Sequence, residues 1–296
     1  MFSTHLIKTL HKITLKLRKI ETKDMLKTIL NVKILQKLSL FGLYFAKCIQ
    51  NTKTPMNKGI LNIINQANQQ NKKLISVLID PDNRNFGHLG KLLNLCNKNQ
   101  IDFLLVGGSI LSEGNIEETI TFIKANSKIP IILFPGTTHQ VCDLADAILL
   151  LSLVSGRNAD LLIGKQMESA FRLKNSGLEI MSTAYLLIDG GKPTTASYIS
   201  FTQPLPSNKP MLAAATALAA EQLGMKLIYM DAGSGADFSI NKETIQKVRQ
   251  NTSNPIIIGG GLKTKEAIKL AFEAGATMVV IGNALETNPE LLNEII

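Results

Sequence analysis

The sequence has few of the residues that build disulfide frameworks, histidine metal sites or membrane spans. It holds three cysteines and four histidines in 296 residues. Cys48, Cys96 and Cys142 show no paired spacing, which indicates a reduced, cytoplasmic protein. Only His88 and His139 lie beyond the first 55 residues, and this argues against a His-rich metal site. The longest uncharged apolar run near the N-terminus, 38–46, falls short of the roughly 20 residues that span a bilayer.

Acidic residues are nearly absent from the first 55 residues, and this absence locates the excess positive charge. The formal net charge is +9, and residues 1–55 hold eleven Lys and Arg residues against Glu21 and Asp24. The rest of the chain therefore has basic and acidic side chains in equal number. Its charge gives no reason to expect a nucleic-acid partner.

Three interpretations of residues 1–55 compete. Lysine and leucine at loose helical spacing would suit an amphipathic helix on an anionic membrane surface. A transit peptide is the second interpretation, although Arg18 is the only arginine of the segment. We favour the third, a basic extension that is not part of the following domain, because translation could begin at Met56. The boundary is placed at 53–55, since Pro55 disfavours helix in the residue before it.

From Met56 to the end, eight short β-rich runs alternate with helical stretches, which is typical of βαβ units and a parallel sheet. Most of these runs are apolar throughout, as in strands buried on both faces. Segments 211–223 and 264–274 are predicted helices. The pattern predicts a single-domain (β/α)8 TIM barrel over residues 56–296. The predicted strands are 74–79, 102–106, 130–134, 147–151, 179–188, 226–230, 255–258 and 277–281.

Glycine and small polar or acidic residues follow every predicted strand. The segments are DPDN, GGS, PGTTHQ, SLVSGRN, DGGKPT, DAGSGAD, GG and GNAL, in chain order. One such loop means little, because these are common turn residues. Eight at the same end predict an active site at the carboxyl ends of the strands, where barrel enzymes carry theirs.

Two of these loops predict a phosphate site. Gly259, Gly260 and Gly261 follow the seventh strand, and Gly282 and Asn283 follow the eighth. Glycines let backbone N–H groups approach an anion, and the loops after strands seven and eight are the usual phosphate site of this fold. The alternative is a pair of tight turns.

The first two loops offer oxygen ligands for a metal. Asp80, Pro81 and Asp82 end the first strand, and Ser109 follows two glycines after the second. A carboxylate and a hydroxyl on neighbouring strands suit Mg²⁺ shared with substrate phosphates. A simple Asp-Pro-Asp turn remains the alternative.

The sixth strand ends in Tyr229-Met230-Asp231-Ala232-Gly233-Ser234-Gly235. Tyr229 and Asp231 are two residues apart, so they share one face of the strand. A phenol and a carboxylate beside a Gly-Ser-Gly anion cradle could bind and deprotonate a hydroxyl of a phosphorylated polyol.

Seven stretches, in this order, carry a resemblance to a known family. They are LIDPDN (78–83), VGGS (106–109), FPG (134–136), LIDGGKPT (187–194), YMDAGSG (229–235), IIGGG (257–261) and GNALE (282–286). The set resembles the geranylgeranylglyceryl phosphate synthase family, which also includes the bacterial heptaprenylglyceryl phosphate synthases. The resemblance begins near Met56 and leaves residues 1–55 unmatched.

The resemblance implies transfer of a prenyl group, with geranylgeranyl diphosphate as the expected donor, to the sn-3 hydroxyl of sn-glycerol 1-phosphate, releasing diphosphate. It implies Asp80 and Ser109 as Mg²⁺ ligands and Tyr229 and Asp231 as catalytic residues. The glycerol phosphate would be bound by Tyr229, Met230, Asp231, Ala232, Gly233, Ser234, Gly235, Gly260, Gly261, Gly282 and Asn283. We expect a cytoplasmic homo-oligomer, no nucleic-acid partner, and allow for a peripheral membrane contact for the lipid product.

Two positions depart from the family pattern. Asp231 stands where the family usually has Glu, and Leu78 stands where some members have Lys two residues before the first-strand Asp. The second departure suggests a subgroup that binds phosphate with other cations. The prenyl tail needs an apolar groove, which we expect Phe134, residues 149–153 and Tyr185 to line.

Two other functions remain open at this stage. A phosphosugar isomerase of the histidine- or tryptophan-biosynthesis type would share the phosphate site. It would also need an acid–base pair at strands one and five, for which Asp80 and Asp189 are the candidates. A non-enzymatic phospholigand-binding or membrane-scaffolding role is the third function.

Overall fold

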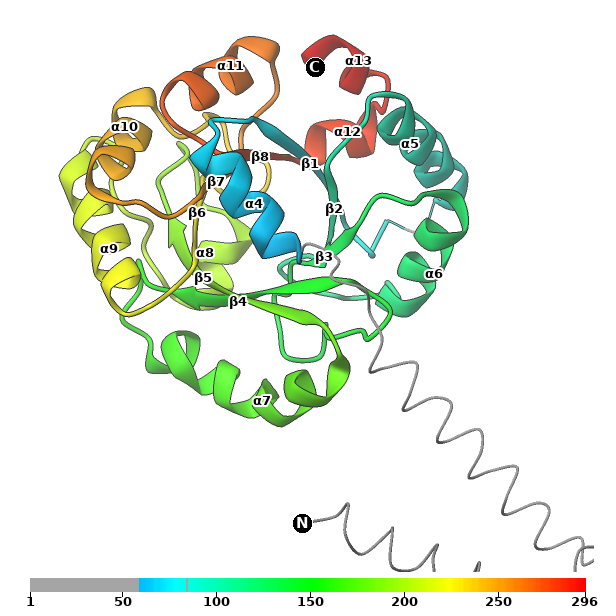
Figure 1. The fold of residues 1–296 in the computed structure, drawn as a ribbon, viewed down its shortest axis with the longest axis horizontal. Coiled ribbons are helices and arrows are strands. Elements are labelled where there is room, and N and C mark those ends of the chain that lie inside the picture. The colour runs from blue at the N-terminus through cyan, green and yellow to red at the C-terminus, as the bar shows by residue number, and fades with distance from the viewer. Residues whose placement is uncertain (1–58, 84) are drawn as a thin grey trace, which may run out of the picture. The chain divides into compact units, whose positions relative to one another are not determined.

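Eight parallel strands close into a barrel in the order of the chain (Figure 1). The computed structural model describes residues 59–83 and 85–296, so the predicted extension 1–55 lies outside the described residues. The closed sheet confirms the predicted TIM barrel. Its strands are β1 (Leu74–Ile79), β2 (Phe103–Val106), β3 (Ile131–Leu133), β4 (Ala147–Leu153), β5 (Glu179–Leu187), β6 (Leu227–Asp231), β7 (Ile256–Gly259) and β8 (Met278–Ile281).

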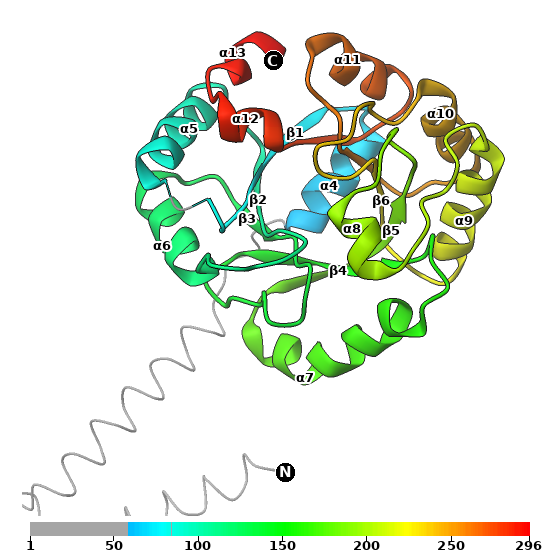
Figure 2. The ribbon, with the colours of Figure 1, turned by 180° about the vertical axis from the view of Figure 1, so that it is seen from behind.

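Helices surround the barrel, as Figures 1 and 2 show. They bury its outward-facing side chains. The predicted helices 211–223 and 264–274 are confirmed as α9 (Pro210–Gln222) and α11 (Lys265–Glu273). The helices that follow β1 are α5 (Phe86–Lys98), α6 (Ile116–Asn126), the π-helix η1 (Asp160–Gly164), α7 (Lys165–Ser176), α8 (Thr195–Ser200), α9 (Pro210–Gln222), α10 (Lys242–Asn251), α11 (Lys265–Glu273), α12 (Asn283–Thr287) and α13 (Leu291–Ile295).

Two local features differ from the simple repeat. The connection 134–146 between β3 and β4 is described throughout and forms no helix. β4 is two residues longer than the predicted run 147–151, because Ser152 and Leu153 pair with Ala184 and Tyr185 of β5. The first two residues of the predicted loop SLVSGRN therefore belong to the strand.

The helix α4 (Ile60–Gln69) closes the amino end of the barrel, across the face turned to the viewer in Figure 1. Ile60, Ile64 and Ala67 are buried in the cluster that fills the barrel interior. Glu179, at the start of β5, accepts hydrogen bonds from the backbone N–H groups of Ile60 (2.5 Å) and Leu61 (3.2 Å). This carboxylate caps the positive end of the helix dipole, so α4 is fixed at the end of the barrel away from the predicted site.

Candidate active site

A cavity of about 810 Å³ opens at the carboxyl ends of the strands, the end shown in Figure 2. Every strand, or the segment that follows it, contributes lining residues, among them Asp80, Ser109, Phe134, Leu149, Tyr185, Tyr229, Gly260 and Asn283. Parallel strands bring all their carboxyl ends to one end of a barrel. The cavity therefore lies where the loop composition predicted it.

Asp231 is the last residue of β6 and is almost fully buried at the cavity wall. Its Oδ2 accepts a hydrogen bond from the hydroxyl of Tyr185 (2.6 Å), and its Oδ1 accepts one from the backbone N–H of Gly233 (2.7 Å). Burial raises the pKa of this carboxyl, although both hydrogen bonds act in the opposite direction. The result is a carboxylate that binds a proton more readily than an exposed aspartate does.

Tyr229 lies two residues before Asp231, inside the barrel, as the strand alternation predicted. Its ring stacks on Phe134 with centroids 4.9 Å apart and is tilted against Tyr185 at 5.6 Å. Burial, and then the charge of Asp231, raises the pKa of Tyr229 well above its ordinary value. The phenol is therefore neutral at physiological pH and can donate a hydrogen bond but cannot act as a base.

Tyr185 is a site residue that the sequence reasoning assigned only to the apolar groove. β5 and β6 pair so that Tyr185 lies directly beside Tyr229, and its hydroxyl reaches Asp231 from the neighbouring strand. Burial and the same carboxylate raise the pKa of Tyr185 well above its ordinary value. Tyr185 and Tyr229 each lie two residues before the last residue of their strand. This shared position could have indicated the pairing.

The loops after β6 and β7 form a tight backbone cradle. Gly260 has φ +77°, and a Cβ at this position would lie 2.6 Å from the backbone N of Gly233 and 2.8 Å from Oδ1 of Asp231. Only glycine fits there without displacing the backbone or the carboxylate. The cradle therefore depends on glycine for space as well as for conformation.

The predicted phosphate-binding segments after β6 and β8 meet in the structure. The hydroxyl of Ser234 donates a hydrogen bond to Oδ1 of Asn283 (2.6 Å). Ser234, Gly235, Gly261, Gly282 and Asn283 all line the cavity. The structure thus brings the two predicted phosphate loops and the Gly-Ser-Gly segment together at one side of the opening.

Met230 and Ala232 belong to the predicted binding stretch, but their side chains point outward. Both are buried in the core between the barrel and its helices. Neither residue lines the cavity, and neither does Gly233. Any contact of Met230, Ala232 and Gly233 with a ligand would come through the backbone.

Asp80 and Ser109 both line the cavity. The β2 loop passes against Asp80, because a Cβ at Gly108 would lie 2.8 Å from Oδ2 of Asp80. Burial raises the pKa of Asp80. Burial, and then the charge of Asp80, also raises the pKa of Glu286 in α12. Together with Asp231, three carboxyl groups therefore line one cavity. Glu286 had been given no role from the sequence.

This donor set fits a magnesium ion that shares its coordination with a substrate. Within residues 59–83 and 85–296, no group of three or more His, Cys, Asp and Glu side chains could hold a metal. Mg²⁺ commonly takes one or two carboxylates and fills its other positions with water and phosphate oxygens. A cation would also offset the repulsion between Asp80 and Glu286, and Ser109 supplies a neutral oxygen.

Asp82, two residues from Asp80, has a different role. Its carboxylate accepts hydrogen bonds from the hydroxyl of Ser112 (2.7 Å) and from the backbone N–H groups of Ser112, Glu113 and Gly114. Desolvation is the largest single effect and raises its pKa, but the hydrogen bonds together outweigh it and lower the pKa to about 2. Asp82 is absent from the cavity lining, so it anchors the loop after β2.

Gln140 is a second residue that the sequence did not single out. It is buried, and its Nε2 donates to the carbonyl of Gly108 (2.9 Å). Its Oε1 accepts from the N–H groups of Gly136 (3.1 Å) and Gly108 (3.4 Å). This side chain holds the loop that carries Ser109 against the loop after β3. Its position in the helix-free connection 134–146 explains why strand and helix patterns gave no signal for it.

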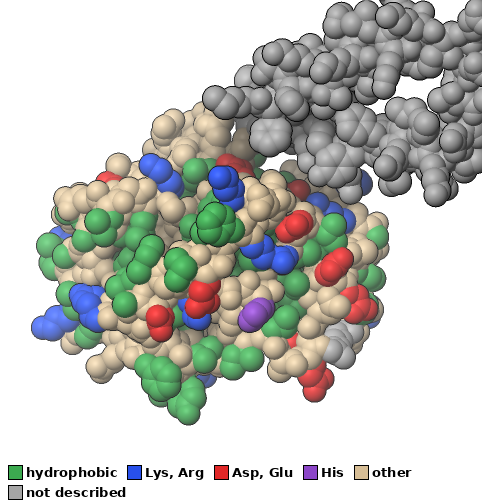
Figure 3. Space-filling model, turned by 90° about the horizontal axis from the view of Figure 1, so that it is seen from below, with side chains coloured by type: hydrophobic (Ala, Val, Ile, Leu, Met, Phe, Trp, Pro, Cys, Tyr) green, Lys and Arg blue, Asp and Glu red, His purple; other side chains and the backbone are tan. Residues whose placement is uncertain are grey.

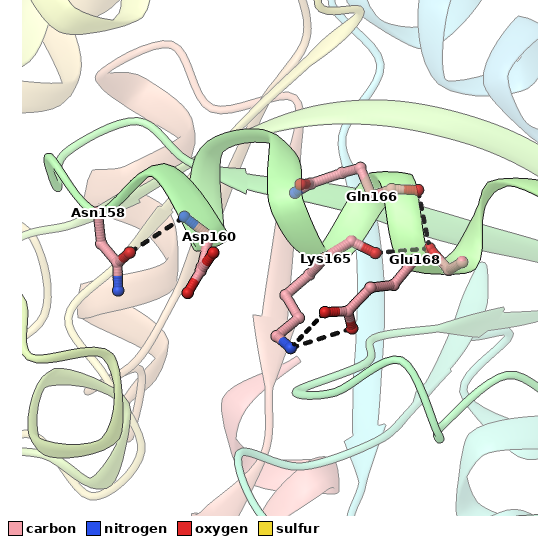
Figure 4. Close-up of polar contacts among 6 residues, drawn as sticks. Asn158, Asp160, Lys165, Gln166 and Glu168 are labelled. Carbon is pink, nitrogen blue, oxygen red and sulfur yellow. Dashed lines mark hydrogen bonds and ion pairs between the residues drawn. The ribbon is translucent and has the colours of Figure 1, made fainter.

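An apolar arm of the cavity extends between β4 and α7. All the residues expected to line a prenyl groove, except Ser152, line the cavity. Gln166 of α7 donates to the carbonyl of Leu151, while its buried Oε1 has no hydrogen-bond partner in the part of the chain that the structure describes. In Figure 4 this side chain points away from the Lys165–Glu168 ion pair of the outer surface. The arm is lined mainly by apolar side chains, and Lys165, Gln166 and Ser169 of α7 are polar residues among its lining.

Comparison with known sequences places the chain in a family. Residues 67–296 match the sequence profile of the PcrB family. The chain belongs to this family. It is 44% identical over 240 residues to the geranylgeranylglyceryl phosphate synthase of Chitinophaga pinensis, which covers 81% of this chain and 95% of that protein. It is 39% identical over 219 residues to the enzyme of the same name from Pyrococcus furiosus, which covers 74% and 86%.

A solved structure of similar fold has its substrate bound. It is the (S)-3-O-geranylgeranylglyceryl phosphate synthase of Thermoplasma acidophilum in complex with sn-glycerol-1-phosphate. The TM-score is 0.75 and the identity 29%, over 80% of this chain and 95% of the other. These matches confirm that the chain resembles the geranylgeranylglyceryl phosphate synthases, as its seven sequence stretches predicted.

Three further features of this PcrB-family protein bear on the earlier expectations. Asp189, which the isomerase alternative requires as a partner for Asp80, is exposed and does not line the cavity. Leu78 lines the cavity and contacts Gly282, whereas Lys165 and Lys263 are the lysines among the lining residues. No helix within residues 59–296, as far as they are described, has the length and apolar character needed to cross a membrane.

Proposed function

We propose that this protein is a Mg²⁺-dependent prenyltransferase that joins a prenyl group to the sn-3 hydroxyl of sn-glycerol 1-phosphate. The observation that carries the proposal is one cavity with three chemically different parts: an anion cradle, a buried tyrosine–carboxylate pair and an apolar arm. A phosphorylated polyol and an isoprenoid tail need these three environments side by side. The similarity to synthases of this name supports the same substrates.

The acceptor would bind with its phosphate at the cradle of Ser234, Gly235 and Gly260. Backbone N–H groups and the adjoining helix start favour an anion there. Lys263 lines the same cavity, and its ammonium donates to the carbonyl of Ala236 (2.8 Å), which leaves further N–H groups for a phosphate. The glycerol hydroxyls would then reach toward Asp231.

The donor diphosphate would lie beside Asp80, Ser109 and Glu286. These residues would hold the Mg²⁺ ion, which neutralises the charge that develops on the departing diphosphate. Gln140 positions the loop of Ser109 for this contact. The prenyl tail would occupy the apolar arm beside Ile148, Leu150 and Leu173.

Asp231 would accept the hydroxyl proton during the transfer. The C1–O bond of the donor breaks with its electron pair on diphosphate, the glycerol oxygen bonds to C1, and the hydroxyl proton passes to Asp231. Each carboxylate oxygen accepts one hydrogen bond from the protein and has a second lone pair for the substrate. The raised pKa of Asp231 makes it a better base than an exposed aspartate.

A direct assay tests this function. The full-length protein is incubated with labelled sn-glycerol 1-phosphate and prenyl diphosphates of several chain lengths, among them geranylgeranyl diphosphate. We expect a labelled product soluble in organic solvent, lost on chelation and restored by Mg²⁺. The enantiomer sn-glycerol 3-phosphate is the matched control. No product with any donor would overturn the proposal.

A further inference from the structure

Large hydrophobic side chains gather around the opening of the cavity. We define the mouth patch as Ile110, Tyr198, Ile199, Phe201 and Phe238. Tyr198 is 81% exposed, Phe201 91% and Phe238 68%, and the two isoleucines are also exposed. They follow strands β2, β5 and β6, so all lie at the carboxyl end of the barrel. In Figure 3, hydrophobic side chains stand out along the lower edge, the end opposite α4.

The mouth patch is continuous with the cavity. Ile110 and Ile199 line the cavity and are exposed outside it as well. Phe238 packs beside the loop that leads into α8, since a Cβ at Gly191 would lie 2.9 Å from its ring. Single exposed hydrophobic residues need no explanation, but a group around a binding site indicates a surface that is covered in use.

Phe201 is held in an unusual backbone conformation. It ends α8 with φ +50° and ψ +32°, in the left-handed region that glycine and asparagine adopt most readily. A phenylalanine there is unfavourable for the fold, and its ring gains almost no burial within this chain. An unfavourable residue that contributes no packing points to a function at the surface.

We propose that the mouth patch docks on a lipid bilayer, so that an isoprenoid passes between the membrane and the apolar arm without crossing water. The choice of a bilayer rests on the proposed function. A substrate or product with an apolar tail partitions into membranes, since each buried CH₂ contributes about 0.8 kcal/mol. A second copy of the chain seated on this face would instead cover the opening through which the tail must pass.

The charges near the mouth patch indicate which lipid it suits. Lys192 is paired with Asp237 at 3.1 Å, directly beside Phe238. Arg157 donates its hydrogen bonds to the carbonyls of Val154 and Gly156. Of the two lysines that line the cavity, Lys165 is paired with Glu168 and Lys263 donates to the carbonyl of Ala236, so each cation already has a partner. Docking would therefore come from insertion of aromatic and aliphatic side chains, and it would persist on zwitterionic lipid and at high salt.

The test is flotation of the full-length protein with phosphatidylcholine vesicles at high salt. These conditions suppress the electrostatic binding expected of the basic residues 1–55. We expect wild-type protein to float with the vesicles. The double variant Tyr198→Ser, Phe201→Asn should bind at least about tenfold more weakly, because two aromatic anchors are lost. Neither residue lines the cavity.

The variants are chosen so that unfolding cannot imitate the result. Asparagine tolerates the left-handed conformation, so Phe201→Asn should keep or raise the melting temperature. Leu223→Ser is the matched control, since Leu223 is 80% exposed at the amino end of the barrel. Equal vesicle binding by wild type and double variant would overturn the proposal. So would a change in sedimentation of the double variant without lipid, which would assign the patch to a second copy.

Separate measurements distinguish a failure of membrane docking from a failure of the proposed prenyl transfer. Vesicle binding is measured without substrate, and turnover is measured separately with a short, water-soluble prenyl diphosphate. The double variant should keep wild-type turnover with this donor and lose turnover at least about tenfold with a long donor presented in vesicles. Loss with both donors would contradict the docking role.

Discussion

The carboxylate of Asp231 is enclosed at the end of β6, where burial raises its pKa and disfavours its charged form. If it accepts the hydroxyl proton, Asp231→Asn should lower turnover about 10²-fold or more, the scale of a positioned acid–base group. Asp231→Glu, the length usual in the family, should retain or improve turnover. The comparison is made from kcat with saturating substrates. If Asp231→Asn keeps its activity and Asp231→Glu is inactive, the catalytic assignment is wrong. Asp231 would then have only the structural role of binding Gly233 and Tyr185.

The same carboxyl predicts a pH dependence of stability. Its folded pKa lies above the unfolded value, so ionisation destabilises the folded protein as pH rises from about 3.8 through the raised pKa. Below about pH 3.8 this destabilisation disappears, because the carboxyl is protonated in both the folded and the unfolded protein. The melting temperature of Asp231→Asn relative to wild type should therefore increase with pH across this window and stay higher at neutral pH. A constant difference across the pH range would contradict the raised pKa.

Asp80 and Asp82 are expected to respond differently to the same substitution. Asp80→Asn should cut the rate by orders of magnitude and weaken the dependence on Mg²⁺ without unfolding the protein, because its carboxylate faces the cavity. Retained activity with an unchanged Mg²⁺ titration would remove Asp80 from the site.

Asp82→Asn is the stability counterpart of that experiment. Its low pKa stabilises the fold above about pH 3.8, and this contribution is lost as pH falls toward about 2. Asp82→Asn should lower the melting temperature at neutral pH by about 2–4 °C. The difference from wild type should shrink in acid, and a difference that persists at the lowest pH would contradict the assignment.

At the scale of elements, the loops after β2 and β3 depend on one side chain. Gln140→Ala would remove the hydrogen bonds that this side chain makes to the backbone of Gly108 and Gly136, each worth about 0.5–1.5 kcal/mol. We expect a lower melting temperature and a higher Mg²⁺ concentration at half-maximal activity, because Ser109 follows Gly108. Glu179→Gln, which weakens the cap of α4 at the other end, should lower stability without moving the Mg²⁺ titration. Equal Mg²⁺ curves for wild type and Gln140→Ala would refute the positioning role.

At the scale of the whole molecule, the described barrel has its own closed sheet and its own interior, with α4 in place at the amino end. The family match begins at residue 67. We therefore predict that deletion of residues 1–55 leaves the melting temperature and turnover nearly unchanged. Differential scanning calorimetry measures the melting temperature, and the prenyl-transfer assay measures turnover. A large loss of either would show that the segment contributes to the folded protein.

The sequence by itself determined the barrel and the end at which its cavity lies. Apolar runs separated by helical stretches specify parallel strands, and parallel strands bring their carboxyl ends together. The glycines of the cradle and the Tyr229–Asp231 pair could be read directly, because a spacing of two residues on a strand fixes a shared face. These features depend on local periodicity, which is present in the sequence.

Only the tertiary structure decided which side chains meet across strands. The Tyr185–Asp231 hydrogen bond joins residues 46 positions apart, and the contact depends on the register of β5 against β6. Asp80 and Asp82 are neighbours with opposite pKa shifts, since one faces the cavity and the other a loop. The role of Gln140 and the proximity of Glu286 to Asp80 likewise arise from packing. Hydrogen bonds and burial act through space, and a linear sequence does not record these distances.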